Sequence, residues 1–230
     1  MRLPDKTTAI EEAIARIPDG ATVMLGGFGV PGTPFTLIRE LVRQGQKNLT
    51  VIKNDANEKG MGVDHLLASG QVARLVTTHI GLNPRAVALK NAGSLDVEFC
   101  AQGILAERVR AGGAGLKAVV ADIGLDTDLA RGKPRIELGG AVGVVETALR
   151  ADAALLHAGR ADTFGNLRYA ATARNFNPLM AMAGDLVIAE AEIVLPPGGL
   201  APEDIHTPGP FVDHVVRLAH LSEEYGVVRR

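Results

Sequence analysis

The segment Asp19–Pro34, which reads DGATVMLGGFGVPGTP, constrains the fold of this chain more than any other segment. A turn at Asp19-Gly20 precedes the apolar run Val23–Leu25, and such a run predicts a strand that is buried on both faces of a sheet. The glycines that follow allow a sharp bend, or the close approach of a ligand, because glycine has no side chain to clash. The segment therefore predicts a buried strand that ends in a tight, glycine-rich loop.

A helix is expected directly after this loop. Thr33 and Pro34 are typical of an N-cap and a first helical residue, and the helix is expected to extend to Gln44. Unpaired N–H groups at its start would point into the loop, where the positive end of the helix also favours negative charge. The segment thus predicts a site for a phosphate group, or for an oxyanion that forms during a reaction.

Composition supports an α/β protein and excludes several classes. Hydrophobic residues make up 47% of the chain and aromatic residues only 3%, so we expect an aliphatic core like that of a parallel sheet. Lys and Arg total 24 against 26 for Asp and Glu, so the chain lacks the basic excess of a nucleic-acid-binding protein. Cys100 is the only cysteine, which excludes an intrachain disulfide, and we expect it to be a buried side chain without a chemical role.

The beginning of the chain does not resemble a targeting segment. Asp5, Glu11 and Glu12 occupy the region where a signal peptide would need an apolar block, and no apolar run is long enough to span a bilayer. We therefore expect a cytoplasmic protein whose partners include neither nucleic acid nor a membrane.

Strand and helix patterns alternate along most of the chain, which predicts an open, mainly parallel sheet flanked by helices. Strands are expected at 49–52, 72–78, 94–100, 153–157 and 186–189, and helices at 7–17, 63–68, 84–91 and 103–111, the last closed by Gly112 and Gly113. Residues 116–146 are less regular, and Gly139-Gly140 predicts a hairpin turn there. We expect one domain over residues 1–230, with a small antiparallel lobe around 116–146.

The glycine loop also contains a G-x-G-x-x-G pattern, formed by Gly27, Gly29 and Gly32, which is typical of dinucleotide-binding folds. The context departs from that pattern, because Pro31 and Pro34 stiffen the loop and Asp55 is only loosely placed as a ribose ligand. An NAD(P)-dependent oxidoreductase therefore remains an alternative. A non-catalytic domain that senses a small ligand is a second one.

A longer pattern is more specific. The succession of Asp19-Gly20, an apolar triplet, Gly26–Phe28, Gly32 and Pro34 resembles the signature of family I CoA-transferases, in the first of their two subunits or halves. The resemblance continues over nearly the whole chain, through Asn54, His79–Gly81, Asn83-Pro84, Ala101–Gly103, Ala106–Arg108, Arg110–Gly115, Ala173–Pro178 and Pro202–His214. It is strongest to the α subunits of bacterial acetate, butyrate or acetoacetate CoA-transferases. The chain is also similar to the N-terminal half of succinyl-CoA:3-oxoacid CoA-transferase.

The resemblance implies transfer of CoA from an acyl-CoA to a short-chain carboxylate or 3-oxo acid through a glutamyl-CoA thioester. A carboxylate nucleophile retains the thioester energy in such a covalent intermediate. The family's glutamate lies in a Ser-Glu-Asn-Gly motif of the second subunit, and this chain contains no such motif. The resemblance therefore implies a β partner, an α2β2 heterotetramer, CoA and acyl-CoA as substrates, and no tightly bound cofactor.

The resemblance also assigns roles to residues of this chain. It implies contact with CoA for the loop residues Gly26, Gly27, Phe28, Gly29, Val30, Pro31 and Gly32. Gln102 matches the family glutamine whose amide helps to hold the tetrahedral oxyanion, and such a donor contributes about 3 to 4 kcal/mol in a comparable acyl-transfer site. Asn54, expected where a strand ends at the sheet edge, is a second polar contact.

Structural alternatives exist for each of these residues. The glycine loop could be a plain connection between a strand and a helix, and Gln102 could cap the helix that follows it. We expect Arg174–Pro178 to be a structural turn. No metal site is expected, because the histidines lack the spacing of metal ligands and are taken as structural; they include His79, His157, His206 and His214.

One segment departs from the family pattern. Family members usually carry a Thr-Pro-Thr-Gly-like segment after Gly115, whereas this chain has Ala121–Thr127, with the carboxylates Asp122 and Asp126. If this segment lines the acyl pocket, Asp122 would disfavour dicarboxylates such as succinate by like-charge repulsion.

Overall fold

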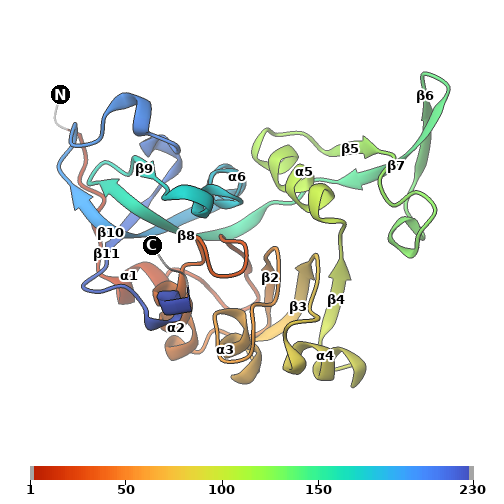
Figure 1. Ribbon diagram of the computed structural model, residues 1–230, viewed down its shortest axis with the longest axis horizontal. Helices are drawn as coiled ribbons and strands as arrows, with labels where there is room; N and C mark the ends of the chain where they lie inside the picture. Colours follow the sequence, from red (N-terminus) through yellow and green to blue (C-terminus); the bar gives the residue numbers. More distant parts are fainter. Residues whose placement is uncertain (1–2, 228–230) are drawn as a thin grey trace.

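A sheet of seven parallel strands forms the centre of the computed structural model, which describes residues 3–227 (Figure 1). The strand order is β11-β10-β8-β1-β2-β3-β4, and the short strand β9 pairs antiparallel with β8. The strands are β1 (Thr22–Leu25), β2 (Leu49–Ile52), β3 (Val72–Thr77), β4 (Asp96–Phe99), β8 (Ala151–Asp162), β9 (Leu167–Arg168), β10 (Gly184–Leu195) and β11 (His214–Arg217). The predicted open, mainly parallel α/β fold is confirmed.

The chain order reverses at β1. From β1 the chain moves outward through β2, β3 and β4, and it later returns to the other side of β1 with β8, β10 and β11. Met24 in β1 pairs with Ile52 of β2 and with Ala154 of β8, so strands from both directions meet there. In open α/β sheets, ligands bind beyond the carboxyl ends of the strands at such a reversal point. The glycine loop leaves β1 at this position.

Helices cover both faces of the sheet (Figure 1). One face packs against α1 (Ile10–Ile14), α2 (Phe35–Gln44), α3 (Val63–Ala68) and α4 (Pro84–Asn91), and the other against α5 (Gln102–Gly113) and α6 (Asn177–Ala183). In β1, Val23 and Leu25 point to the first core and Met24 to the second. The two cores consist mainly of aliphatic side chains, as composition predicts. Short 3-10 helices lie at Asp128–Ala130, Ala171–Arg174, Pro202–Asp204, Gly209–Phe211 and Glu223–Val227.

An antiparallel arm projects from the body between α5 and β8 (Figure 1). Its strands β5 (Ala118–Ala121), β6 (Arg135–Leu138) and β7 (Ala141–Thr147) pair in the order β5-β7-β6. Gly139 and Gly140 form the hairpin turn with φ angles of 58° and 79°, which side chains rarely adopt. The predicted lobe and its turn are therefore confirmed.

Two predicted helix boundaries are wrong. The first helix begins at Ile10 and not at Thr7, because Thr7 is extended and forms an isolated bridge to Val215. The fifth helix runs through Gly112 and Gly113, which were expected to close it. A Cβ atom on Gly112 would lie 1.9 Å from the carbonyl oxygen of Leu149, so this glycine allows close packing and does not end the helix.

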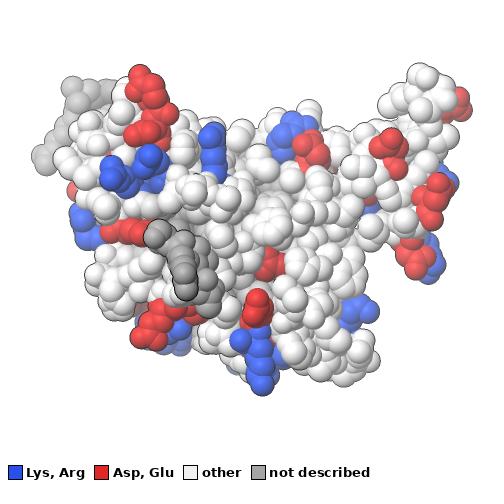
Figure 2. Space-filling view, viewed as in Figure 1, with Lys and Arg blue, Asp and Glu red and all other residues white. Residues whose placement is uncertain are grey.

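The surface carries no large field of one charge on the face drawn in Figure 2. Acidic and basic side chains are interspersed there, and the area between body and arm is largely uncharged. Within residues 3–227, no helix is both long enough and apolar enough to cross a lipid bilayer.

Candidate active site

The glycine loop folds back on itself at the end of β1. The amide of Gly26 still donates to Leu155 of β8 over 2.9 Å, and the amide of Phe28 donates to the carbonyl of Pro31 over 3.1 Å. Gly27 has a φ of +98°, and a Cβ atom there would lie 2.2 Å from the hydroxyl oxygen of Thr33. Only glycine fits this position, so the loop has a fixed shape.

The start of α2 differs from the prediction. Pro34 occupies the N-cap position, and the Thr33 hydroxyl donates to the carbonyl of Gly29 over 2.7 Å, so Thr33 does not cap the helix. The amide of Leu37 donates to the carboxylate of Glu190 over 2.9 Å. Because this buried carboxylate from β10 already lies at the positive end of the helix, the prediction that the helix start faces a ligand is wrong.

Glu190 also pairs with His157, a residue that the spacing of the histidines indicated to be an isolated structural one. The two ring nitrogens of His157 lie 2.8 Å from Glu190 and 3.2 Å from Glu192, and both His157 and Glu190 are buried. Burial alone would lower the pKa of His157, but the hydrogen bonds with the two carboxylates outweigh it and raise the pKa above 6.5. The cluster holds β8, β10 and the start of α2 together.

A support for the glycine loop comes from the segment Arg174–Pro178. The side chain of Asn175 donates to the carbonyl of Pro31 over 2.9 Å, and that of Asn177 donates to Gly32 over 3.1 Å. The oxygen of the Asn177 side chain lies only 2.0 Å from where a Cβ atom on Gly26 would be. This segment therefore has the structural role that was expected, and it acts on the candidate site itself.

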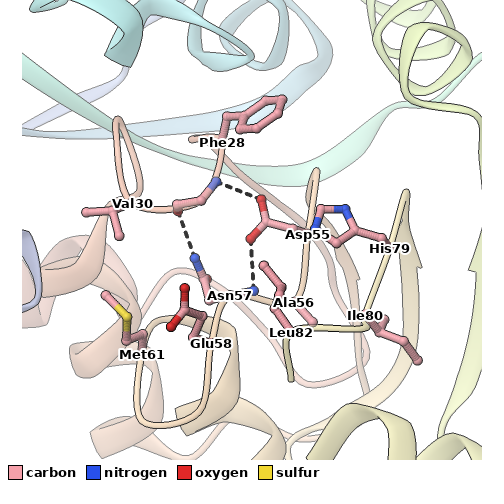
Figure 3. Close-up of a pocket in the computed structure, with 11 residues that line it drawn as sticks. Phe28, Val30, Asp55, Ala56, Asn57, Glu58, Met61, His79, Ile80 and Leu82 are labelled. Carbon is pink, nitrogen blue, oxygen red and sulfur yellow. Dashed lines mark hydrogen bonds between the residues drawn. The ribbon is translucent and has the colours of Figure 1, made fainter. Parts of the chain in front are cut away.

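Asp55, which follows β2, binds the other side of the loop (Figure 3). Its carboxylate accepts hydrogen bonds from the amides of Gly29 at 2.8 Å and of Asn57 at 2.9 Å. The side chain of Asn57 in turn donates to the carbonyl of Gly29 over 2.8 Å. With both its oxygens engaged and only 4% of its surface exposed, Asp55 is poorly placed to bind a ribose.

A buried cation lies next to Asp55. The ammonium group of Lys53 is 3.4 Å from the carboxylate, and Lys53 is fully buried. Burial lowers the pKa of Lys53 despite the nearby carboxylate. Burial opposes ionisation of Asp55 as well, but Lys53 and the hydrogen bonds from Gly29, Asn54 and Asn57 outweigh it and hold the pKa of Asp55 below its usual value. Asp55 is therefore a carboxylate at neutral pH.

The two predicted polar residues of the site are in direct contact. The side-chain nitrogen of Gln102 lies 2.9 Å from the side-chain oxygen of Asn54, and the nitrogen of Asn54 lies 3.0 Å from Asp55. Asn54 is buried, whereas Gln102 is exposed at the first position of α5. The N-cap of α5 is Ala101 and no side chain caps it, so the alternative in which Gln102 caps this helix is wrong.

The backbone of Asn54 is also fixed. Its carbonyl accepts hydrogen bonds from the hydroxyls of Thr77 at 3.1 Å and Thr78 at 2.6 Å, which end the neighbouring strand. Sequence reasoning missed the roles of Lys53 and Asp55. The signal that could have found them is the run Lys53–Asp55 itself, three polar residues directly after a buried apolar strand.

A small cavity of about 130 Å³ opens between the loops that follow β1, β2 and β3 (Figure 3). Its lining is mainly apolar, and Asp55 and His79 lie together on one side of it (Figure 3). Phe28 and Leu82 border it and are 46% and 62% exposed. The lining consists of Phe28–Val30, Asp55–Glu58, Met61, His79, Ile80 and Leu82. The cavity suits a short, apolar group.

Other residues considered in the sequence lie outside this cavity. Asp122 is exposed in the arm, and no residue of 116–146 lines the cavity. Cys100 is buried and receives a hydrogen bond from Arg108 over 2.9 Å; burial raises the pKa of its thiol, so it is not a reactive thiolate. In the part of the chain that the structure describes, no group of three or more His, Cys, Asp or Glu side chains is arranged to hold a metal ion.

Fold and site define an α/β protein with a ligand site at the carboxyl edge of its sheet, and comparison with known proteins gives the family. Residues 7–218 match the family model described as Coenzyme A transferase. The chain therefore belongs to the coenzyme A transferase family.

Relatives with curated names are single subunits of larger enzymes, and several are named alpha, which implies a β partner. The alpha subunit of a probable coenzyme A transferase of Bacillus subtilis (strain 168) is 46% identical over 92% of this chain and 93% of its own length. One subunit of the succinyl-CoA:3-ketoacid coenzyme A transferase of Xanthomonas campestris pv. campestris (strain B100) is 44% identical over 94% and 88% of the two chains. The alpha subunit of the acetate CoA-transferase of Escherichia coli (strain K12) is 39% identical over 92% and 96%.

Solved structures agree with this assignment. A variant of the decarboxylase AibA/AibB is 30% identical with a TM-score of 0.80, over 94% of this chain and 84% of that chain. An acyl-CoA transferase of E. coli O157:H7 in a thioester complex with CoA has a TM-score of 0.85 at 22% identity, over 99% of this chain and 49% of that chain. At that identity the second likeness shows the fold alone.

Proposed function

We propose that this chain is the α subunit of a CoA-transferase that moves CoA from an acyl-CoA to a short-chain carboxylate or 3-oxo acid. The observation that carries the proposal is the contact between Gln102 and Asn54 at the sheet edge, in a chain of the coenzyme A transferase family. The amide of Gln102 is exposed beside the glycine loop, where it is free to meet a substrate. The names of relatives that act on acetate or 3-ketoacids support this substrate class.

In this proposal the chain supplies the groups that stabilise negative charge, and the β partner supplies the nucleophile. Attack of a glutamate carboxylate on the thioester carbonyl creates an oxyanion, to which Gln102 donates a hydrogen bond. A preorganised donor of this kind contributes about 3 to 4 kcal/mol to the stability of the transition state. The absence of a Ser-Glu-Asn-Gly motif from this sequence supports the assignment of the nucleophile to the partner.

The glycine loop and the cavity would bind the two ends of the acyl-CoA. The loop Gly26–Gly32 contacts CoA, with the exposed ring of Phe28 offering an apolar surface. The cavity beside Asp55 takes the short acyl chain, because its lining is mainly apolar and its volume is only about 130 Å³. CoA and acyl-CoA are thus substrates, and the proposal includes no tightly bound cofactor.

Coexpression with a β subunit that carries Ser-Glu-Asn-Gly tests the proposal. We expect an α2β2 complex that transfers CoA between acyl-CoA and acetate or acetoacetate. Mass spectrometry after incubation with acyl-CoA should find the CoA adduct on the β glutamate. A CoA adduct on this chain would contradict the proposal, as would a stable complex without transfer. Because a decarboxylase is among the similar structures, the assay should also follow loss of CO₂.

No observation favours the alternatives. Asp55 is enclosed and the start of α2 is occupied by Glu190, so neither the ribose nor the phosphate contacts of a dinucleotide fold are available. A nicotinamide cofactor should therefore leave the melting temperature of the complex unchanged, since only a ligand of the native state raises it.

A further inference from the structure

We propose that Asp55 is a positioning residue, which sets the direction of the hydrogen bonds from Gln102 to Asn54 and keeps the N–H side of Gln102 turned toward the reacting group. This inference rests on the proposed function, because it takes Gln102 as the donor to the oxyanion. It adds a reason why the Gln102 amide has one orientation and not the reverse.

The direction follows from what each group can do. A carboxylate accepts hydrogen bonds and has none to donate, so Asn54 must turn its NH₂ group to Asp55, at 3.0 Å. The oxygen of Asn54 then faces Gln102, which must present its own NH₂ group, at 2.9 Å. One N–H group of Gln102 is used in this contact, and within residues 3–227 no second acceptor is bonded to its nitrogen. The other N–H group is therefore available to a substrate.

Asp55 is held firmly enough to impose this direction. It is 4% exposed, it lies 3.4 Å from the fully buried ammonium of Lys53, and it accepts the amides of Gly29 and Asn57 at 2.8 and 2.9 Å. Its lowered pKa means that it stays ionised at neutral pH and does not become a donor. Lys53 and Asp55 thus form the fixed end of a chain of hydrogen bonds that reaches the surface at Gln102.

The nearly isosteric substitution Asp55→Asn removes this constraint. The new carboxamide can donate to the oxygen of Asn54, which lets Asn54 and then Gln102 turn over. A reversed Gln102 places its carbonyl oxygen where its N–H group had been, and this oxygen would repel a developing oxyanion. Because Asp55 also holds Gly29, the substitution can change the KM for acyl-CoA. The value of kcat is therefore the quantity that reports on Gln102.

A double-mutant cycle in the α/β complex tests the proposal. We expect Asp55→Asn and Gln102→Ala each to lower kcat about 10²-fold. In the Gln102→Ala background, Asp55→Asn should lower kcat by no more than about 3-fold further, because residues that act through one contact are not additive. Thermal melting of each variant shows that the complex is folded.

A matched control is available in α3. Asp64 is also a buried carboxylate, and it accepts the amide of Gly60 at 2.8 Å and the guanidinium of Arg85 at 3.0 Å. Asp64→Asn should lower the melting temperature without lowering kcat. The exchange Asn54→Asp with Asp55→Asn provides a rescue, because Asp at position 54 again accepts from Gln102 and from Asn at position 55. We expect this exchange to regain about 10-fold in kcat over Asp55→Asn alone.

The outcomes separate this inference from the function on which it rests. A normal kcat for Asp55→Asn would overturn it, as would a loss that persists in full in the Gln102→Ala background. In both cases a low kcat for Gln102→Ala itself would leave the proposed function standing. An unchanged kcat for Gln102→Ala would contradict both. If Asp55→Asn fails to assemble, the exchange variant decides: activity close to that of the parent supports the inference, and loss of activity in a folded complex contradicts it.

Discussion

The side-chain nitrogen of Gln102 lies 2.9 Å from the side-chain oxygen of Asn54, although the two residues follow strands that do not touch. Gln102 comes after β4 and Asn54 after β2, and β3 separates these strands in the sheet. The contact therefore crosses the carboxyl edge above β3, where Thr77 and Thr78 hold the backbone of Asn54. It joins an exposed amide to a buried network, which is why single substitutions there should have large effects on catalysis.

Replacing Gln102 by Ala should lower kcat about 10²-fold, because one donor to the oxyanion is lost. Gln102 is exposed, so the complex should still assemble and melt within a few degrees of the parent. Steady-state kinetics on the α/β complex measures the change. Gln44→Ala, at the last position of α2, is the matched control and should leave kcat unaltered. Equal kcat values for the two variants would remove Gln102 from the site.

The effect of His157 on stability should depend on pH. Its pKa is raised in the folded protein, so its ionised form stabilises the fold below the unfolded pKa of about 6.5, and this contribution is lost as the pH rises through the folded pKa. The free energy of unfolding of the parent, minus that of His157→Gln, should therefore be largest in acid and fall as pH rises. Urea titrations at several pH values measure it.

The comparison of parent and variant matters because other histidines act in the opposite sense. The pKa values of His206 and His214 are lowered, chiefly by burial, so these residues cost stability as the pH falls. Subtracting the curves removes their contribution. A difference that grows with rising pH would mean that His157 is not stabilised as a cation by Glu190 and Glu192.

Two glycines of α5 should respond in opposite ways to the same substitution. A Cβ atom on Gly112 would lie 1.9 Å from the carbonyl oxygen of Leu149, so Gly112→Ala should destabilise the protein by about 1 to 3 kcal/mol. Gly103 in the same helix has nothing within 4 Å of that position. Gly103→Ala should be neutral, or stabilise the helix by up to about 1 kcal/mol. Denaturant unfolding compares them, and similar losses would contradict the packing role of Gly112.

The cavity beside Asp55 should select acyl chains by length. Met61 lines it, so Met61→Ala should enlarge it and shift preference from acetate toward longer monocarboxylates. One extra methylene in an apolar pocket changes kcat/KM by about 10- to 200-fold, which bounds the expected shift. Competition between acetate, butyrate and hexanoate on the complex measures it. An unchanged order of preference would show that the acyl chain binds elsewhere.

Local patterns in the sequence predicted the framework of the site. Apolar runs located β1, β2 and β3, and because parallel strands end at one edge, they placed Asn54 close to the glycine loop. Gln102 was found through the resemblance to a family. Neither route indicated that the Gln102 amide would bind Asn54, because their contact spans 48 residues and has no local signature.

The start of α2 shows where local rules fail. Thr33 and Pro34 follow the statistics of helix starts, yet the carboxylate that satisfies Leu37 comes from Glu190, 153 residues further along the chain. A side chain that distant is not visible to rules about neighbouring residues. The same holds for Lys53, since nothing in an apolar run followed by Lys-Asn-Asp shows that its ammonium group is fully enclosed.

The oxygen of Asn177 occupies the space that a methyl group on Gly26 would need. These two positions are therefore bound in their history, because neither is free to vary without regard to the other. A lineage that gained alanine at position 26 must first have shortened or turned the side chain at position 177, and the reverse order would pass through a damaged ancestor.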